Sequence, residues 1–311
     1  AVLAEARCAT PQQDYRGTLA AIVELVSQLE PAGVCPVGIG TPGSVIPTTG
    51  LMHNCNSTCL NGQPLLADLN NLLQDRIRLA NDADCFALSE ATDGSAAQAD
   101  SVFGIILGTG VGGGLVLRGA LVQGAGGLAG EWGHNPMPLE RVSCSDQLKA
   151  RLPSRHCYCG QLNCIESYLS GPGLATTHEV LWSQHASPVS IYNRAVADAP
   201  EALNELLSHA LSEPDWQPPD NTPEVAQQAQ GSLAVSCAML VSALSGGVNL
   251  LDPQVIVFGG GLSNMQAIYQ PVEDALHVRA FGGRGATRLR PPYFGDDSGV
   301  RGAAWLWEPP Y

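Results

Sequence analysis

Charged residues are scarce in this chain of 311 residues, and positively charged ones are the scarcest. Charged side chains make up 14% of the sequence, with 15 Lys and Arg against 29 Asp and Glu, which gives a formal net charge of −14. A surface this acidic repels phosphate backbones, so we expect no nucleic-acid partner. Hydrophobic residues still reach 45%, which argues against a disordered chain and against a coiled coil.

Long apolar runs are also rare. The first fifteen residues include three charges and no apolar run, so we expect neither a signal peptide nor a transit peptide there, and a cytoplasmic protein. The uncharged stretch from Gly231 to Leu251 is long enough on paper to cross a bilayer. Four serines, one asparagine and a Gly-Gly pair lower its hydrophobicity, and the strand-like QVIVF follows closely. We therefore expect a buried helix of a large domain and no membrane partner.

Helical and strand-like patterns alternate along the chain. Apolar residues recur at helical spacing in residues 17–30 and 65–73, and short apolar runs that end in turns occupy residues 37–43 and 76–82. This alternation favours an α/β fold. The small residues at 94–100 precede two strand-like runs, so we place a domain boundary there. The Pro-rich residues 214–223 are expected to form a loop between helices.

Two glycine-rich turns could bind phosphate. GTGVGGG occupies residues 108–114 between apolar strands, and GGGLSN occupies residues 259–264 between the strand-like VIVF and an expected helix. Small residues let a backbone approach a ligand and point its amides at phosphate oxygens. An ordinary hairpin turn explains the first motif equally well by itself. GGGLSN does not fit the dinucleotide fingerprint and the acidic partner of a dinucleotide site is not evident, so the pair indicates a mononucleotide.

The tripeptide AND at residues 80–82 lies where a strand is expected to end and a helix to begin. Near a helix N-terminus, Asp82 would stay ionised and could accept a proton from a hydroxyl group. An ordinary Asn-Asp helix cap explains the same residues, so the local sequence leaves both interpretations open.

Three cysteines and a histidine have the composition of a closed zinc site. GEWGH at residues 130–134 and CYCGQLNCIE at residues 157–166 supply the four ligands His134, Cys157, Cys159 and Cys164. Such a set suits tetrahedral zinc. A disulfide or scattered core thiols are the alternatives, although a disulfide scaffold would be short and secreted. A metal here would fix Glu131 and Glu166 in space, where they could bind sugar hydroxyls.

In their order and separations, these motifs resemble the ROK family of sugar kinases and repressors, within the actin-like ATPase superfamily. The resemblance runs from about Ala1 to Tyr311 and rests on GTPG, AND, GTGVGGG, GEWGH, CYCGQLNCIE and VIVFGGGLSN. It implies a two-lobed actin-like (ribonuclease H-like) α/β fold. Residues 1–95 and 298–311 would form a small lobe, and residues 96–297 a larger lobe with the zinc motif and the nucleotide-binding turns.

Within the family, NSTCLNG at residues 56–62, GEWGHNPMP and GDDSGVRGAAWLW look most like bacterial fructokinases of the mannofructokinase type. N-acetylglucosamine kinases are the nearest neighbours. The resemblance thus implies ATP-dependent phosphorylation of fructose to fructose 6-phosphate, with N-acetylglucosamine or another hexose as the alternative substrate. Mg²⁺ would accompany ATP, and Zn²⁺ would be structural.

The resemblance also implies a role for each motif. Asp82 would be the catalytic base. The sugar hydroxyls would be held by Gly43, Asn56, Asn81, Glu131, His134 and Glu166. The phosphates and the nucleotide would be contacted by Gly108, Thr109, Gly110, Gly260 and Gly261. Zinc would be ligated by His134, Cys157, Cys159 and Cys164, so that His134 serves both the metal and the sugar.

One departure from the family concerns the start of the chain. Family members begin with a strand and an Asp-x-Gly-Gly-Thr phosphate turn, and this sequence starts just after that point. We expect roughly twenty preceding residues in the complete protein, on the usual reach of a β-hairpin. The chain as written would then bind sugar but handle ATP poorly, and its small sheet would have an unpaired edge.

Two other classes of function remain as alternatives. A sugar-responsive repressor would need a DNA-binding helix-turn-helix, and only about forty residues precede GTPG. A catalytically inactive sugar-binding protein would differ from a kinase in ATP turnover with fructose. A homodimer is compatible with either reading.

Overall fold

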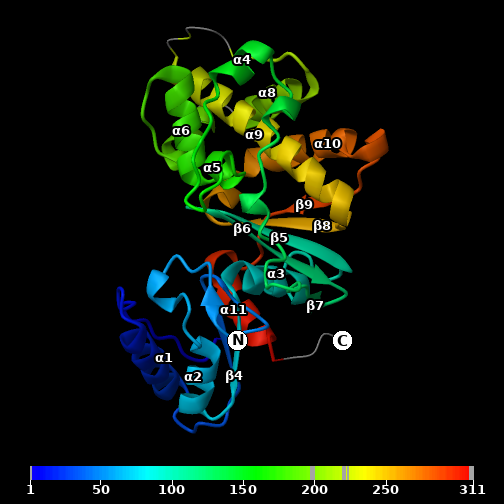
Figure 1. Cartoon of the computed structure of the whole chain (residues 1–311). Helices are drawn as coiled ribbons and strands as arrows, with labels where there is room; N and C mark the ends of the chain where they lie inside the picture. The colour runs from blue at the N-terminus through cyan, green and yellow to red at the C-terminus, as the bar shows by residue number, and fades with distance from the viewer. Residues whose placement is uncertain (1, 197–199, 219–221, 223, 308–311) are drawn as a thin grey trace.

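The computed structural model describes residues 2–196, 200–218, 222 and 224–307 (Figure 1). Strands and helices alternate over most of this range, which confirms the expected α/β class. Figure 1 shows two lobes, the larger one above and the smaller one below, with two helices lying between their sheets.

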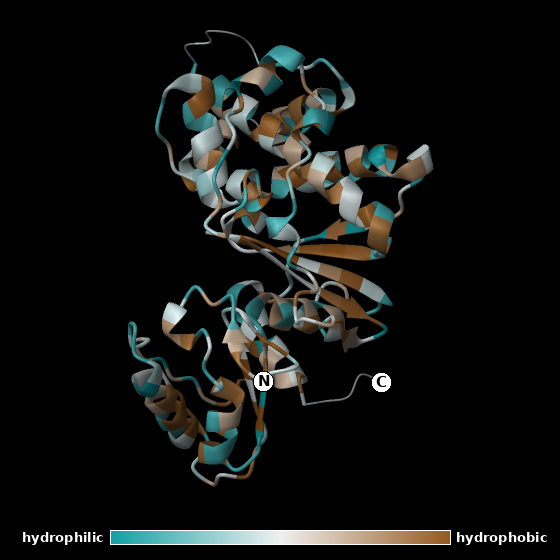
Figure 2. Cartoon of the chain, viewed as in Figure 1, coloured by the Kyte–Doolittle hydropathy of each residue, from teal (hydrophilic) through white to brown (hydrophobic). Residues whose placement is uncertain are grey.

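The larger lobe is built on a five-stranded sheet of order β7-β6-β5-β8-β9. The strands are β5 (Ser101–Leu107), β6 (Val111–Leu117), β7 (Ala120–Leu121), β8 (Val255–Gly259) and β9 (Arg288–Arg290). Neighbouring strands among β7, β6 and β5 are antiparallel, whereas β8 and β9 run parallel to β5. Successive side chains of β5 point to opposite faces: Phe103 and Ile105 pack with the helices above, and Val102 packs with the helix below. Because both faces are covered, the strands are hydrophobic along most of their length (Figure 2).

Helices cover the upper face of this sheet (Figure 1). They are α4 (Asp146–Arg151), α5 (Glu166–Leu169), α6 (Gly171–Trp182), α7 (Pro188–Val196), α8 (Pro200–Ser212), α9 (Val225–Leu251) and α10 (Tyr269–Arg279). Among the described residues, α9 has the length and composition of a membrane span, and 72% of its most apolar window is buried inside the protein. The expected buried helix is thus confirmed. The Pro-rich loop also lies between helices as expected, although residues 219–221 and 223 are outside the described range.

The smaller lobe has little sheet. Its elements are α1 (Tyr15–Leu29), β1 (Val37–Thr41), β2 (Ser44–Val45), β3 (Met52–His53), α2 (Leu65–Leu73) and β4 (Ile77–Asn81). Within the described residues, β1 pairs in parallel with β4 alone, and β2 pairs with β3. Leu65, Leu69 and Leu73 of α2 are buried as the helical spacing predicts, whereas Leu72 is exposed and lies outside this face.

Short 3₁₀ turns complete the chain. They are η1 (Thr58–Leu60), η2 (Trp132–His134), η3 (Leu139–Arg141), η4 (Gly261–Asn264), η5 (Gln266–Ile268), η6 (Phe281–Gly283) and η7 (Gly295–Asp297). The sequence predicts a helix directly after the second glycine-rich turn. The structure instead places η4 and η5 there, and α10 begins only at Tyr269.

Two helices lie between the sheets, α3 (Asp82–Thr92) and α11 (Ser298–Trp305). Glu90 of α3 is fully buried, and its carboxylate accepts hydrogen bonds from the Ser298 hydroxyl at 2.7 Å and from the Tyr293 amide at 3.0 Å. This anchor joins the end of the chain to residues near 90, as the expected small lobe of residues 1–95 and 298–311 requires. The division itself stays a prediction, and residues 308–311 lie outside the described range.

The contact of α11 with α3 and β1 leaves no room for side chains at two glycines. A Cβ atom on Gly302 would lie 1.6 Å from the Cys85 carbonyl oxygen, and one on Gly38 would lie 1.6 Å from the Ala303 carbonyl oxygen. Glycine is therefore required at both positions by close approach of the backbones.

Gly302→Ala should lower the free energy of unfolding by about 1–3 kcal/mol or more, because the added methyl group forces α11 away from α3. Gly299→Ala is the matched control, since nothing lies within 4 Å of its added Cβ in the same helix. This control should gain up to about 1 kcal/mol from helix propensity. Urea unfolding followed by circular dichroism measures both; equal stability of the two variants would contradict the close approach.

Candidate functional site

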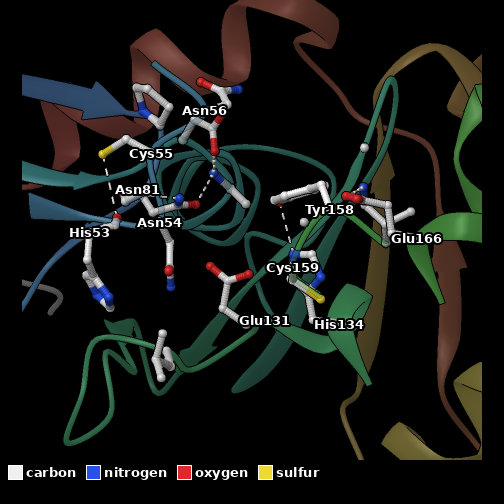
Figure 3. A pocket seen from close by; sticks show the side chains of 18 of the residues that line it. His53, Asn54, Cys55, Asn56, Asn81, Glu131, His134, Tyr158, Cys159 and Glu166 are labelled. Carbon is white, nitrogen blue, oxygen red and sulfur yellow. Dashed lines mark hydrogen bonds between the residues drawn. The ribbon is translucent and has the colours of Figure 1, made fainter. Parts of the chain in front are cut away.

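A cleft of about 1160 Å³ opens between the two lobes (Figure 3). Most of the residues predicted from sequence line it: Gly43, Asn56, Asn81, Asp82, Gly108, Thr109, Gly110, Glu131, His134, Cys159 and Glu166. Cys157 and Cys164 lie behind this lining, and Gly260 and Gly261 lie outside it. The fold thus brings together residues that are up to 123 positions apart, from Gly43 to Glu166.

Asn81 and Asp82 mark the junction of β4 and α3. The Asn81 side-chain oxygen accepts a hydrogen bond from the Ala83 amide at 2.8 Å, which is an ordinary N-cap. The Asn81 side-chain nitrogen donates to the Gly43 carbonyl oxygen at 3.3 Å and so joins the GTPG turn to the helix start. The two interpretations of AND are therefore compatible: Asn81 caps the helix, and the Asp82 side chain still lines the cleft.

Three carboxyl groups stand close together beside this junction. Burial raises the pKa of Asp82, while the amides of Ala83 and Asp82 itself act to lower it. Burial also raises the pKa of Asp84 to about 7, helped by the negative charges of Glu131 and Asp82. The pKa of Glu131 is raised, first by burial. The raised pKa of Asp84 favours the neutral form of a carboxyl group that lies behind the cleft lining formed by Asp82 and Glu131.

The GEWGH segment packs closely against β6 because its two glycines have no side chains. A Cβ atom on Gly130 would lie 2.3 Å from the Gly113 carbonyl oxygen, and one on Gly133 would lie 2.1 Å from the Val111 carbonyl oxygen. Between them, the Trp132 indole N–H donates to the Gly112 carbonyl oxygen at 3.3 Å. With Trp132 buried, Glu131 and His134 on either side of it line the cleft (Figure 3).

The GTGVGGG motif divides into two parts with different neighbours. Gly108, Thr109 and Gly110 form the turn between β5 and β6 and line the cleft. Gly114 lies within β6, where a Cβ atom would lie 2.6 Å from the Ala83 carbonyl oxygen. Gly112 and Gly114 therefore give α3 room to pack against the sheet. The first part of the motif offers the amides that a phosphate could reach.

The four predicted metal ligands converge. One potential ligand atom from each of His134, Cys157, Cys159 and Cys164 lies within 4.8 Å of all the others. The His134 Nδ1 to Cys157 Sγ distance is 3.6 Å, and the Cys159 Sγ to Cys164 Sγ distance is 3.5 Å. In tetrahedral zinc sites, neighbouring ligand atoms lie about 3.5–3.8 Å apart. The set therefore fits such an ion, and none of the four residues is part of a disulfide in the structure.

His134 presents its two ring nitrogens to different neighbours. Nδ1 faces Cys157, whereas Nε2 lies 3.1 Å from the Tyr158 hydroxyl oxygen, and the two rings meet edge to face (Figure 3). The geometry therefore allows one nitrogen to serve a metal while the other points to the cleft.

The second glycine-rich turn abuts the first. Gly260 follows β8 with a positive φ of 75°, and a Cβ atom there would lie 2.7 Å from the Leu107 carbonyl oxygen. The two turns are thus adjacent at the ends of neighbouring strands, although only the first one lines the cleft.

Sequence reasoning missed several lining residues, including His53, Asn54, Tyr158 and Gln161. The His53 Nε2 atom is buried and has no hydrogen-bond partner in the part of the chain that the structure describes. Tyr158 could have been found from its place between two predicted ligands. His53 belongs to no motif, and only the pairing of β3 with β2 brings it to the cleft.

Two α/β lobes around a cleft, with a sheet of three antiparallel strands followed by two parallel ones, define an actin-like ATPase fold. A ROK hexokinase from Thermus thermophilus has the same fold, with a TM-score of 0.70 and 24% identity over 96% of this chain and 87% of that chain. The sequence profile of the ROK family matches residues 1–213 and 218–309. The chain therefore belongs to the ROK family.

Curated relatives include N-acetyl-D-glucosamine kinases. The protein of Escherichia fergusonii is 37% identical over 304 residues, which span 97% of this chain and 90% of the relative. The protein of Yersinia pseudotuberculosis serotype O:1b is 35% identical over 302 residues, 96% of this chain and 90% of the relative. The expected family is thus confirmed, whereas these relatives do not support the expected nearness to fructokinases.

Proposed function

We propose that the protein transfers the γ-phosphate of ATP to a hydroxyl group of a hexose. The observation that carries this proposal is the position of Asp82. Its carboxylate stands at a capped helix start in a cleft that is lined on one side by hydrogen-bonding side chains and on another by the turn of residues 108–110. Family membership and the relatives named above support the same activity.

In this proposal Asp82 accepts the proton of the attacking hydroxyl as the phosphoryl group is transferred. The sugar is held by side chains and backbone of the cleft, namely Gly43, Asn56, Asn81, Glu131, His134 and Glu166. The turn of Gly108, Thr109 and Gly110 would contact the phosphates through the amides of Thr109 and Gly110, and Gly260 and Gly261 would contact the nucleotide beside them. Mg²⁺ bound to ATP would supply charge neutralisation. Closure of the lobes would exclude water and so limit hydrolysis of ATP.

Two hexoses are candidates for the substrate. The relatives favour N-acetylglucosamine, which we place first. Fructose is the second candidate, because NSTCLNG, GEWGHNPMP and GDDSGVRGAAWLW resemble fructokinase segments and the first two of them contribute to the cleft lining through Asn56, Glu131 and His134.

A coupled spectrophotometric assay of ADP release by the full-length protein decides between them. With N-acetylglucosamine, fructose, mannose and glucose each supplied in turn, kcat/KM should be highest for N-acetylglucosamine. A clear preference for fructose would reverse the order of the two candidates. Sugar binding by calorimetry without ADP release from any of the four would refute the kinase proposal and leave a sugar-binding protein.

Asp82→Asn should reduce kcat by roughly 10²–10⁴-fold with little change in sugar affinity, because the amide keeps the shape but cannot accept the proton. Since burial raises the pKa of Asp82 and the base acts when ionised, wild-type kcat should fall as the pH decreases through a value above that of an ordinary aspartate. The variant should lack this acid limb. A variant with near wild-type turnover would place the base elsewhere.

We further propose that the cluster of His134, Cys157, Cys159 and Cys164 holds one structural Zn²⁺ per chain. The donor set and its spacing support zinc. Zinc binding would contribute folding free energy, since the four ligands must be brought together from two segments.

Elemental analysis of protein purified without chelator should find one zinc per chain. Cys159→Ser should lose most of this zinc, with a lower melting temperature and weaker sugar binding. Cys8→Ser, at an exposed cysteine away from the cluster, should retain the metal and serves as control. Absence of metal from the wild-type protein would contradict the assignment.

A further inference from the structure

Glu166 connects the predicted metal ligands to the turn at residues 108–110. Its Oε2 atom accepts a hydrogen bond from the Val111 amide at 2.9 Å (Figure 3). Its Oε1 atom lies 4.0 Å from the Cys157 Sγ atom. Because Glu166 begins α5 two residues after Cys164, one carboxylate reaches from the ligand segment to the end of the turn.

A second contact holds the other end of the same turn. The Gly171 amide, at the start of α6, donates to the Gly108 carbonyl oxygen at 2.8 Å. The turn is closed internally by the Gly108 amide, which donates to the Gly110 carbonyl oxygen at 3.0 Å. Thr109 and Gly110 thus lie between two residues that are held by hydrogen bonds, Gly108 by the Gly171 amide and Val111 by the Glu166 carboxylate.

Close approach of the carboxylate explains the glycine at position 110. A Cβ atom there would lie 2.6 Å from the Glu166 Oε2 atom. The φ angle of Gly110 is not in the left-handed region, so its conformation alone does not demand glycine. The Glu166 carboxylate occupies the space that a side chain at position 110 would need.

The segment that carries Glu166 is tied to the cysteine loop by a buried arginine. The Arg155 guanidinium donates to the Ser167 carbonyl oxygen at 2.8 Å and to the Gly173 carbonyl oxygen at 3.0 Å, and it lies over the Tyr168 ring at 4.3 Å. The Asn163 side-chain oxygen accepts from the Arg155 amide and from the Tyr168 hydroxyl, both at 2.8 Å. The loop, α5 and the start of α6 therefore form one connected unit.

From these contacts we infer that Glu166 is a positioning residue that sets the geometry of the phosphate turn and couples it to the metal-ligand loop. This inference rests on the proposed function only for the identity of the ligand that the turn binds. Since Oε2 already accepts from the Val111 amide, Oε1 is the oxygen without an amide donor and can accept a sugar hydroxyl. A shift of the loop would therefore move the turn and the sugar-binding atom together.

Amide hydrogen exchange tests this inference without any catalytic readout. In Glu166→Ala, peptides that contain Val111 should exchange roughly tenfold to hundredfold faster, because the amide loses its charged acceptor. In Glu166→Gln, the side-chain oxygen can still accept from Val111, so exchange should stay close to wild type. Glu140→Ala, at an exposed carboxylate of the same lobe, is the control and should leave the turn unchanged.

Gly110→Ala provides a second route to the same effect. The added methyl group would displace the carboxylate from the other side and should also accelerate exchange at Val111. Chelation of the metal from the wild-type protein should do so as well, since the cysteine loop loses the ion that its ligands hold. Unchanged exchange at Val111 in both Glu166→Ala and Gly110→Ala would overturn the inference, whether or not the protein phosphorylates a sugar.

Kinetics then separate positioning from sugar binding. Glu166→Ala should raise the KM for ATP and lower kcat, whereas Glu166→Gln should keep the KM for ATP near wild type and raise mainly the KM for the sugar. Glu131→Ala should affect the sugar KM alone, because the Val111 amide donates to Glu166 and not to Glu131. An ATP KM that is equally affected in all three variants would contradict a specific role for Glu166.

Discussion

The packing of α3 between the two sheets is the constraint on which the cleft depends. Every residue from Ala83 to Ala91 is buried, so this helix has no free face. Glycines give it room on two sides. A Cβ atom on Gly104 of β5 would lie 2.7 Å from the Ala87 side chain, and one on Gly302 of α11 would lie 1.6 Å from the Cys85 carbonyl oxygen. With its axis fixed in this way, the first turn of α3 can hold Asp82 at one place relative to both lobes.

Glu90 and Asp84, two buried residues of α3, differ in how fully their carboxyl groups are hydrogen-bonded. The Glu90 carboxylate accepts hydrogen bonds from the Ser298 hydroxyl and from three backbone amides, those of Ser95, Tyr293 and Phe294. These hydrogen bonds attach the last helix to the rest of the fold. Asp84 has a buried Oδ1 atom without a hydrogen-bond partner among the described residues, and its pKa is raised to about 7. A polar group left unsatisfied costs stability. This cost arises two residues from Asp82, where the raised pKa of Asp84 favours the neutral form of its carboxyl group.

Local motifs account for what the sequence could predict. The β4–α3 junction, the β5–β6 hairpin and the cysteine spacing are encoded by residues adjacent in the chain, and the structure contains all three. Contacts between distant residues were not predictable. The hydrogen bond of Glu166 to Val111 spans 55 positions, and His53 reaches the cleft only through strand pairing. The same holds for Gly114, whose neighbour is a helix rather than a ligand.

Metal ligation would also decide the hydrogen-bonding character of the cleft. A neutral imidazole that ligates through Nδ1 carries its proton on Nε2 and is therefore a donor there. In the structure the Nε2 atom lies 3.1 Å from the Tyr158 oxygen, which can accept a hydrogen bond from it. Asp82 and Glu131 offer acceptors to the same space. A hexose hydroxyl both donates and accepts, so a cleft of carboxylates alone would leave its oxygens unpaired. A metal that fixes the His134 tautomer would direct Nε2–H to the Tyr158 oxygen and leave the Tyr158 O–H to donate into the cleft, an influence that needs no contact between metal and sugar.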